Sequence, residues 1–190
     1  MAMLLCSPVQ AESVLIVALG ADNVAGHGNG HRSGGVMSDQ AFPAQLETLL
    51  HTHGIDAHVI NAGVAGDTCP DILARTDSDV PDGTRLVIFD RPNGNDKKAG
   101  LMDRQPACID AIKSRLATRH VAIFVLPAWE DIPGAVDYRD PDGHHFTAQG
   151  HAVIAAYLVP QVMELLSGQS HWRQYPPKPE RGGTSGRRTQ

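Results

Sequence analysis

The sequence predicts a three-layer α/β/α domain built on a parallel β-sheet. Apolar runs of strand length alternate along the chain with segments whose apolar residues recur at helical spacing. This alternation is typical of parallel sheets whose right-handed crossover helices cover both faces. The chain has 190 residues, of which 42% are hydrophobic and 19% charged, so its size and composition fit one soluble globular domain.

The first strand and helix carry the clearest signals. Residues 13–19 form a short, β-branched and continuously apolar run, which is typical of a strand covered on both faces. This strand is expected to end at a turn at Gly20. Residues 42–50 place apolar side chains at helical intervals, with Gly54 as the expected stop. The expected cap of this helix is Ser38 or Asp39.

The rest of the chain repeats the alternation of strand and helix. Three further strands are expected at 57–61, 85–89 and 121–126. The helices between and after them are expected at 70–75, 103–118 and 147–166, the last interrupted in composition by Pro160.

The two ends of the chain are expected to lie outside this domain, which spans 13–166. Residues 1–12 resemble either the remnant of a signal peptide or a frayed N-terminus. The protein would be periplasmic or secreted in the first case and cytoplasmic in the second. The tail 167–190 is rich in Pro, Gly, Arg and Lys and is predicted to be disordered.

Charge and hydropathy exclude some partners, and the cysteines leave a question open. The formal net charge is -5 without a dominant basic stripe, which argues against nucleic acid as a partner. No apolar run approaches the ~20 residues that span a bilayer. Cys6 would leave with a signal peptide, so only Cys69 and Cys108 could pair; we expect two unpaired thiols buried on helices. The sequence does not specify an oligomeric state.

Three residues of the motifs described below each follow one of the expected strands. Asp22 follows the first, Gly66 the second and Asn95 the third. In a parallel sheet, ligands bind beyond the carboxyl ends of the strands. These three residues are therefore expected to converge on one rim.

Four short motifs surround these residues. They are Gly20-Ala21-Asp22-Asn23-Val24-Ala25-Gly26, Asn61-Ala62-Gly63-Val64-Ala65-Gly66-Asp67-Thr68, Gly94-Asn95-Asp96 and Asp142-Gly143-His144-His145. In this order, over residues 14 to 166, they resemble the conserved blocks of the SGNH (GDSL-like) hydrolases. The resemblance implies a flavodoxin-like α/β/α fold with a hydrolase site at the strand ends.

The resemblance also implies roles for individual residues. Asp22 stands where the family has its nucleophilic Ser, His145 would be the base, and Asp142 would orient it. Gly66 would offer a backbone N–H and Asn95 a side-chain amide to an oxyanion. The strand before Asn95 ends about one residue later than usual, so Asn93 competes with Asn95 for this role. Arg91, if it faces the rim, would recognise an acidic or sugar substrate; the alternative is a solvated loop face formed by Asp90, Arg91, Lys97 and Lys98.

The replacement of Ser by Asp22 changes the chemistry that is possible. A carboxylate attacking an ester would yield an anhydride, so a different electrophile is expected: a tetrahedral or anomeric carbon that forms an ester, which a His-activated water then hydrolyses. Asp22 could instead act as a general acid or base with His145. We therefore expect hydrolase-type chemistry on a small-molecule or carbohydrate substrate. The alternatives are a non-catalytic binding protein on the same fold and a carboxylesterase.

A metal site is a weaker hypothesis. His27, His31 and the pair His144-His145 could supply ligands together with Asp22 and Asp142. The spacing in a Gly-rich loop is undefined, however, and adjacent histidines usually point apart. We expect neither a metal nor a cofactor.

Overall fold

The sheet is parallel and four-stranded in the part of the chain that the computed structural model describes, residues 13–27 and 34–168. Its strands are β1 (Val14–Gly20), β2 (Ala57–Gly63), β3 (Leu86–Phe89) and β4 (Ala122–Val125), in the order β2-β1-β3-β4. β1 pairs with β2 from Val14↔Ala57 to Gly20↔Gly63, so these strands end side by side. The carboxyl ends of all four strands therefore meet at one edge of the sheet.

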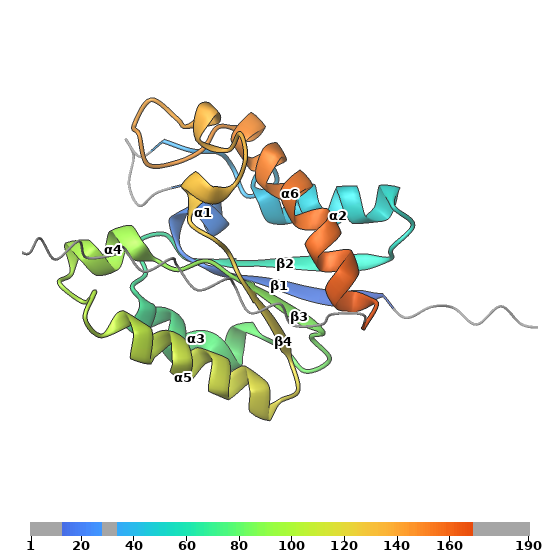
Figure 1. The fold of residues 1–190 in the computed structure, drawn as a ribbon, viewed down its shortest axis with the longest axis horizontal. Coiled ribbons are helices and arrows are strands. Elements are labelled where there is room, and N and C mark those ends of the chain that lie inside the picture. The colour runs from blue at the N-terminus through green and yellow to red at the C-terminus, as the bar shows by residue number, and fades with distance from the viewer. Residues whose placement is uncertain (1–12, 28–33, 169–190) are drawn as a thin grey trace, which may run out of the picture.

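Helices cover both faces of the sheet, which confirms the predicted α/β/α class. Figure 1 shows α2 (Phe42–Thr52) and α6 (Ala148–Leu166) on one face and α3 (Cys69–Asp79) and α5 (Gln105–Thr118) on the other. At the carboxyl edge lie the short helices α1 (Asp22–Ala25) and α4 (Asn93–Lys98). Two single turns, η1 (Trp129–Asp131) and η2 (Val136–Tyr138), connect β4 to α6. Within the described ranges, no helix combines the length and apolar character needed to cross a membrane.

Each face of the sheet has its own buried core. Ile16 and Ala18 of β1 pack toward α2 and α6, whereas Val17 and Leu19 pack toward α3 and α5. All four side chains are fully buried, because successive side chains of a strand point to opposite faces. This two-sided burial explains why β1 is a continuous apolar run rather than an alternating one.

The start of α2 corrects the expected cap. The residue before the helix is Ala41, and neither Ser38 nor Asp39 caps it. Instead, the Phe42 N–H donates to Nδ1 of His151 on α6, at 3.1 Å. His151 is fully buried, and burial lowers its pKa to about 4, so the ring stays neutral and can accept this bond. His151, 109 residues further along the chain, thus accepts the N-terminal hydrogen bond that a local cap residue was expected to accept.

Two other helices differ from their predicted lengths or shapes. α3 extends to Asp79 instead of residue 75, after a reciprocal cap between Thr68 and Asp71. α6 continues through Pro160 without a break. Both Pro160 and Ala156, whose carbonyl loses its helical partner, are exposed, so water can replace the missing hydrogen bond. The segment 1–12 and residues 169–190 of the predicted tail lie outside the described residues, so these predictions stay open.

The expectation of two unpaired thiols is wrong. Cys69, the first residue of α3, forms a disulfide with Cys108 of α5, with 6.2 Å between their Cα atoms. The pairing depends on how α3 and α5 pack on the same face of the sheet, which the spacing of 39 residues does not reveal. The bond ties together the two helices that cover this face.

Reduction of this disulfide is expected to lower the free energy of unfolding by about 2–4 kcal/mol, because the unfolded chain gains the entropy of an opened loop. Denaturant unfolding with and without reductant measures the difference. The double variant Cys69→Ser/Cys108→Ser should show a similar loss and no response to reductant. Equal stability of the oxidised and reduced protein would contradict the expectation.

Candidate active site

The short helix α1 positions Asp22 at the carboxyl edge of the sheet. It lies directly on the ends of β1 and β2, where the strands finish in glycines. A Cβ on Gly63 would lie 2.1 Å from the Ala25 nitrogen, and one on Gly20 would lie 2.5 Å from Cγ2 of Val24. Such distances are far below van der Waals contact, so α1 can sit here only because both strands end in glycine.

One oxygen of Asp22 occupies a pair of hydrogen-bond donors. Asp22 Oδ2 accepts from Nδ2 of Asn95 at 2.7 Å and from the Gly66 N–H at 3.2 Å. The same Asn95 amide also donates to the Asp67 carbonyl at 2.9 Å, which fixes its orientation. The structure thus brings together the three residues that follow β1, β2 and β3 in the sequence.

The other oxygen of Asp22 faces a histidine. Asp22 Oδ1 lies 3.8 Å from Nε2 of His145, which is too long for a direct hydrogen bond. On the opposite side of the ring, Nδ1 of His145 hydrogen-bonds to Oδ2 of Asp142. The order Asp22, His145, Asp142 therefore forms a continuous chain of side chains.

Asp142 is held as a carboxylate. Burial would raise its pKa, but hydrogen bonds from the His145 ring and from the backbone N–H groups of His145 and His144 outweigh this and lower it well below the usual range. Because a carboxylate only accepts hydrogen bonds, Nδ1 of His145 must carry the proton. The lone pair of a neutral ring then lies on Nε2, toward Asp22.

Arg75 on α3 clamps the loops of this site, a role that sequence reasoning missed. Its guanidinium donates to the carbonyls of Gly20 at 2.7 Å and Ala62 at 2.8 Å, and pairs with the carboxylates of Asp67 at 2.7 Å and Asp79. It thereby links the ends of β1 and β2 to the loop that carries Gly66. Nothing local in the sequence distinguishes Arg75 from other basic residues on helices.

The short helix α4 carries both of the asparagines that compete for the donor role. Asn95, rather than the exposed Asn93, donates to Asp22. Arg91 is half-buried, lines the cleft and donates to the Leu126 carbonyl at 3.3 Å. Lys97 and Lys98 are exposed, but they lie on α4 rather than on a loop, and Lys98 also lines the cleft.

Asp90 does not belong to a solvated face. It follows β3 directly and is only 6% exposed, because Gly20 packs against its Cβ. Burial raises its pKa to about 8; Arg91 opposes the shift and Asp22 adds to it. The interpretation of Asp90 as a loop charge is therefore wrong, since the strand keeps the residue inside the sheet edge.

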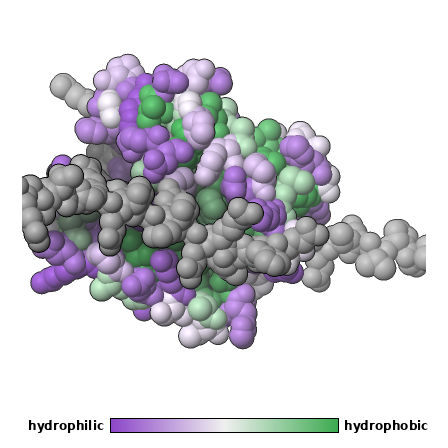
Figure 2. Space-filling model, in the orientation of Figure 1, coloured by the Kyte–Doolittle hydropathy of each residue, from purple (hydrophilic) through white to green (hydrophobic). Residues whose placement is uncertain are grey.

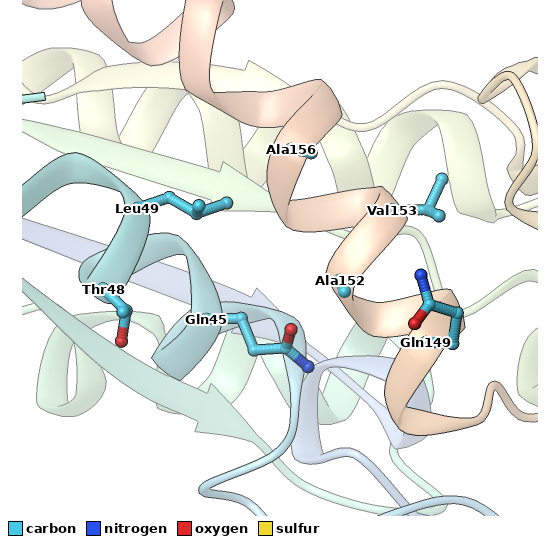
Figure 3. Close-up of a pocket in the computed structure, with 7 residues that line it drawn as sticks. All are labelled: Gln45, Thr48, Leu49, Gln149, Ala152, Val153 and Ala156. Atoms are coloured by element: carbon cyan, nitrogen blue, oxygen red, sulfur yellow. The ribbon is translucent and has the colours of Figure 1, made fainter. Parts of the chain in front are cut away.

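Asp22, Asp90 and His145 line one open cleft of about 980 Å³. Its walls include Trp129 from η1, as well as Pro92 and His144. On the face drawn in Figure 2, hydrophilic and hydrophobic residues are interspersed over the described part of the molecule. A second hollow, of about 450 Å³, lies between α2 and α6 and shares no lining residue with the cleft (Figure 3).

The residues considered for a metal do not assemble into a ligand set within the described ranges. No group of three or more His, Cys, Asp or Glu side chains there is arranged to hold an ion. His144 is exposed while His145 faces Asp22, so the adjacent histidines point apart. His31 lies outside the described residues.

Comparison with known proteins identifies the fold. No family model and no curated protein matches the sequence. Among solved structures, AlinE4, an SGNH-hydrolase family esterase, is 26% identical with a TM-score of 0.58, and the match covers 83% of this chain and 98% of that one. The chain has the SGNH-hydrolase fold. TesA is 18% identical with a TM-score of 0.63, covering 81% of this chain and 99% of its own. The esterase EstA from Pseudoalteromonas sp. is 16% identical with a TM-score of 0.63, covering 80% and 98%.

These similarities confirm the resemblance predicted from the four motifs. Similar solved structures of the SGNH fold include esterases, which supports a hydrolase-like function for this chain. None of these matches bears on the Asp at position 22.

The raised pKa of Asp90 makes stability depend on pH. The folded state binds this proton more tightly than the unfolded state, so its contribution is complete below 3.8 and is lost as pH rises toward about 8. Asp90→Asn should therefore gain stability relative to the wild type, on the order of a few kcal/mol, between about pH 5 and about pH 9. Denaturant unfolding of both proteins at each pH measures this. A difference that does not vary with pH would show that Asp90 is ionised throughout.

Proposed function

We propose that the chain is a hydrolase-like enzyme in which Asp22 attacks a tetrahedral carbon of a small-molecule or carbohydrate substrate. The observation that supports this is that the two carboxylate oxygens of Asp22 have different surroundings. Oδ2 is held by the donors of Gly66 and Asn95, while Oδ1 is left facing His145 and the cleft. A carboxylate held in this way presents one oxygen as a nucleophile in a fixed direction.

In the first step, Oδ1 of Asp22 forms a bond to the substrate carbon. The leaving group departs with the electron pair of the broken bond, and an ester remains on Asp22. No base is needed for this attack when the carboxyl group is ionised. The hydrogen bonds from Gly66 and Asn95 keep the side chain from rotating as the bond forms.

In the second step, His145 activates water. Nε2 takes a proton as the water oxygen attacks Cγ of Asp22, and Asp142 stabilises the resulting imidazolium. Negative charge then develops on Oδ2, which already accepts hydrogen bonds at 2.7 and 3.2 Å. Collapse of this intermediate breaks the bond between Cγ and the substrate oxygen, which takes the proton back from His145 and leaves as an alcohol.

The carboxylesterase alternative is less compatible with this geometry. An ester substrate would have to place its carbonyl oxygen among the donors that Asp22 Oδ2 occupies. Attack by Asp22 would also give an anhydride. Among the described residues, Ser38 lies on the surface before α2 and is exposed, so it does not replace the missing nucleophile.

A non-catalytic binding protein is the second candidate, and the same contacts favour it. Asp22 satisfies both donors as an internal anion would, and this could preserve the fold without any reaction. The two candidates differ in what Asp22→Asn does. A binding protein should keep its ligand and change its stability by about 1–3 kcal/mol, whereas an enzyme should lose several powers of ten in turnover with little change in affinity.

The disulfide between Cys69 and Cys108 supports the exported alternative for the location of the protein. Disulfides persist in oxidising compartments such as the periplasm or the extracellular space and are rare in the cytosol.

Trapping of the ester is the decisive test. In His145→Ala the first step can proceed but the second lacks its base, so an adduct on Asp22 should accumulate and appear as a mass increase in the intact protein. A panel of glycosides, epoxides and haloalkanes serves as probes. The double variant Asp22→Asn/His145→Ala is the matched control and should gain no mass. Turnover without any adduct would favour acid–base use of Asp22.

Restoring the family nucleophile is an independent test of the remaining machinery. Asp22→Ser places a hydroxyl beside His145 and frees the donors of Gly66 and Asn95 for a substrate oxyanion. We expect this variant to gain hydrolysis of a short activated ester such as an aryl acetate, measured by release of the phenolate. The matched variant Asp22→Ala should not gain it. A well-folded Asp22→Ser variant without activity would favour the non-catalytic binding protein over the hydrolase-like enzyme.

A further inference from the structure

Asp90 is a second carboxyl group in the cleft, and the mechanism above does not use it. It is 94% buried (6% exposed), yet it lines the same cleft as Asp22 and His145. Among residues 13–27 and 34–168, its carboxyl group forms no hydrogen bond or ion pair, and the charged groups that influence it are Arg91 and Asp22. Buried polar groups are nearly always paired, so one that opens into a cleft without a partner points to a partner supplied by the ligand.

The position of Asp90 is fixed by the sheet. Its backbone N–H donates to the Leu19 carbonyl of β1 at 2.9 Å, and a Cβ on Gly20 would lie 2.9 Å from its own Cβ. Asp90 therefore enters the cleft from the end of β3, whereas His145 enters from the loop before α6. Asp22 lies on α1, after the strand between β2 and β3.

We propose that Asp90 is the general acid that protonates the leaving oxygen, and that the substrate is therefore one that loses an alkoxide from a tetrahedral carbon, such as an epoxide or a glycoside. This inference rests on the proposed nucleophilic role of Asp22. A halide or a phenolate leaves without a proton, so an enzyme for such substrates has no use for an acid in the cleft. A poor oxygen leaving group requires one.

The surroundings of Asp90 suit an acid at neutral pH. Burial raises its pKa to about 8, Arg91 beside it in the chain opposes this, and the nearby Asp22 adds to it. The other charged or titratable side chains that line the cleft are Lys98, Glu130, Arg139, His144 and His145. Asp22, in contrast, accepts two hydrogen bonds, from the Gly66 N–H and from the Asn95 amide. Two carboxyl groups in such different environments suit an acid and a nucleophile.

The proton balance of the cycle is complete. Asp22 Oδ1 forms a bond to carbon as the bond from carbon to the leaving oxygen breaks, and that oxygen takes the proton of Asp90 with the electron pair. Asp90 is left as a carboxylate. Hydrolysis of the Asp22 ester consumes one water and releases a second hydroxyl group and one proton, which passes through solvent back to Asp90. The sum is addition of water across the broken bond.

His145 is poorly placed for the same task. Its Nε2 lies 3.8 Å from the attacking oxygen of Asp22. In an in-line displacement the leaving group departs on the far side of the carbon from that oxygen. The acid must therefore come from another element of the cleft, and Asp90, at the end of β3, is the lining carboxyl group that lacks any other partner among the described residues.

The test compares two electrophiles in the His145→Ala background, where the Asp22 ester is trapped. Propylene oxide needs a proton to open, whereas bromopropane does not. Asp90→Asn should slow labelling of Asp22 by the epoxide by about 10²–10⁴-fold and leave labelling by the bromide little changed. Asp110→Asn, which removes an exposed carboxylate on α5, is the control and should change neither rate.

The pH dependence of labelling gives a second readout, and its first part uses a protein that keeps Asp90. With Asp90 present, epoxide labelling should fall as pH rises through about 8, because the acid loses its proton, while bromide labelling should not fall. In Asp90→Asn the fall should vanish. An infrared difference spectrum between the two proteins should show the carbonyl band of a protonated carboxylic acid below this pH.

The outcomes separate this inference from the proposed function. Equal slowing of both electrophiles, or of neither, in Asp90→Asn would overturn the acid role while Asp22 remains the nucleophile. A flat pH profile for the epoxide would overturn it as well, even if Asp90→Asn fails to fold. If neither reagent labels Asp22, the proposed function fails, and the role of Asp90 fails with it.

Discussion

The close seating of α1 on the carboxyl edge of the sheet is the constraint on which the site depends. Gly20 and Gly63 end neighbouring strands, and any side chain at either position would collide with α1. Arg75 donates to the carbonyl of Gly20 and pairs with Asp67 in the loop after β2, so it links the two strand ends to that loop. The packing of α1 against these two glycines therefore positions Asp22 beside the donors of Gly66 and Asn95.

A carboxylate differs from a serine hydroxyl in having two oxygens, and this difference organises the rest of the site. When a serine occupies this position, the donors equivalent to the Gly66 N–H and the Asn95 amide bind an oxygen of the substrate. Here Oδ2 of Asp22 already lies on Gly66 and Asn95, so these donors act on the enzyme's own carboxyl group. In the proposed mechanism, they would hold Asp22 in place during its attack and then stabilise charge on the same oxygen during hydrolysis of the ester.

Features that depend on strand ends could be predicted from the sequence, whereas features that depend on packing between distant helices could not. Asp22, Gly66 and Asn95 follow buried strands, so the topology alone brings them to one rim. The disulfide of Cys69 and the cap that His151 supplies to α2 arise from contacts between elements 39 and 109 residues apart. The clamp by Arg75 depends in part on such a contact, because the Gly20 carbonyl lies 55 residues away in the sequence.

Asp90 shows why a local reading of polarity fails at the end of a strand. Its neighbours Arg91, Lys97 and Lys98 are polar, but β3 carries Asp90 into the sheet edge beside Gly20. The fold thus places two carboxyl groups on one cleft with opposite surroundings: Asp22 accepts two hydrogen bonds, and Asp90 accepts none from the described residues. Donors favour the charged form and burial without donors favours the neutral one. A single sheet edge can therefore supply both a nucleophile and an acid, and this pair suits cleavage of a bond whose oxygen must leave with a proton.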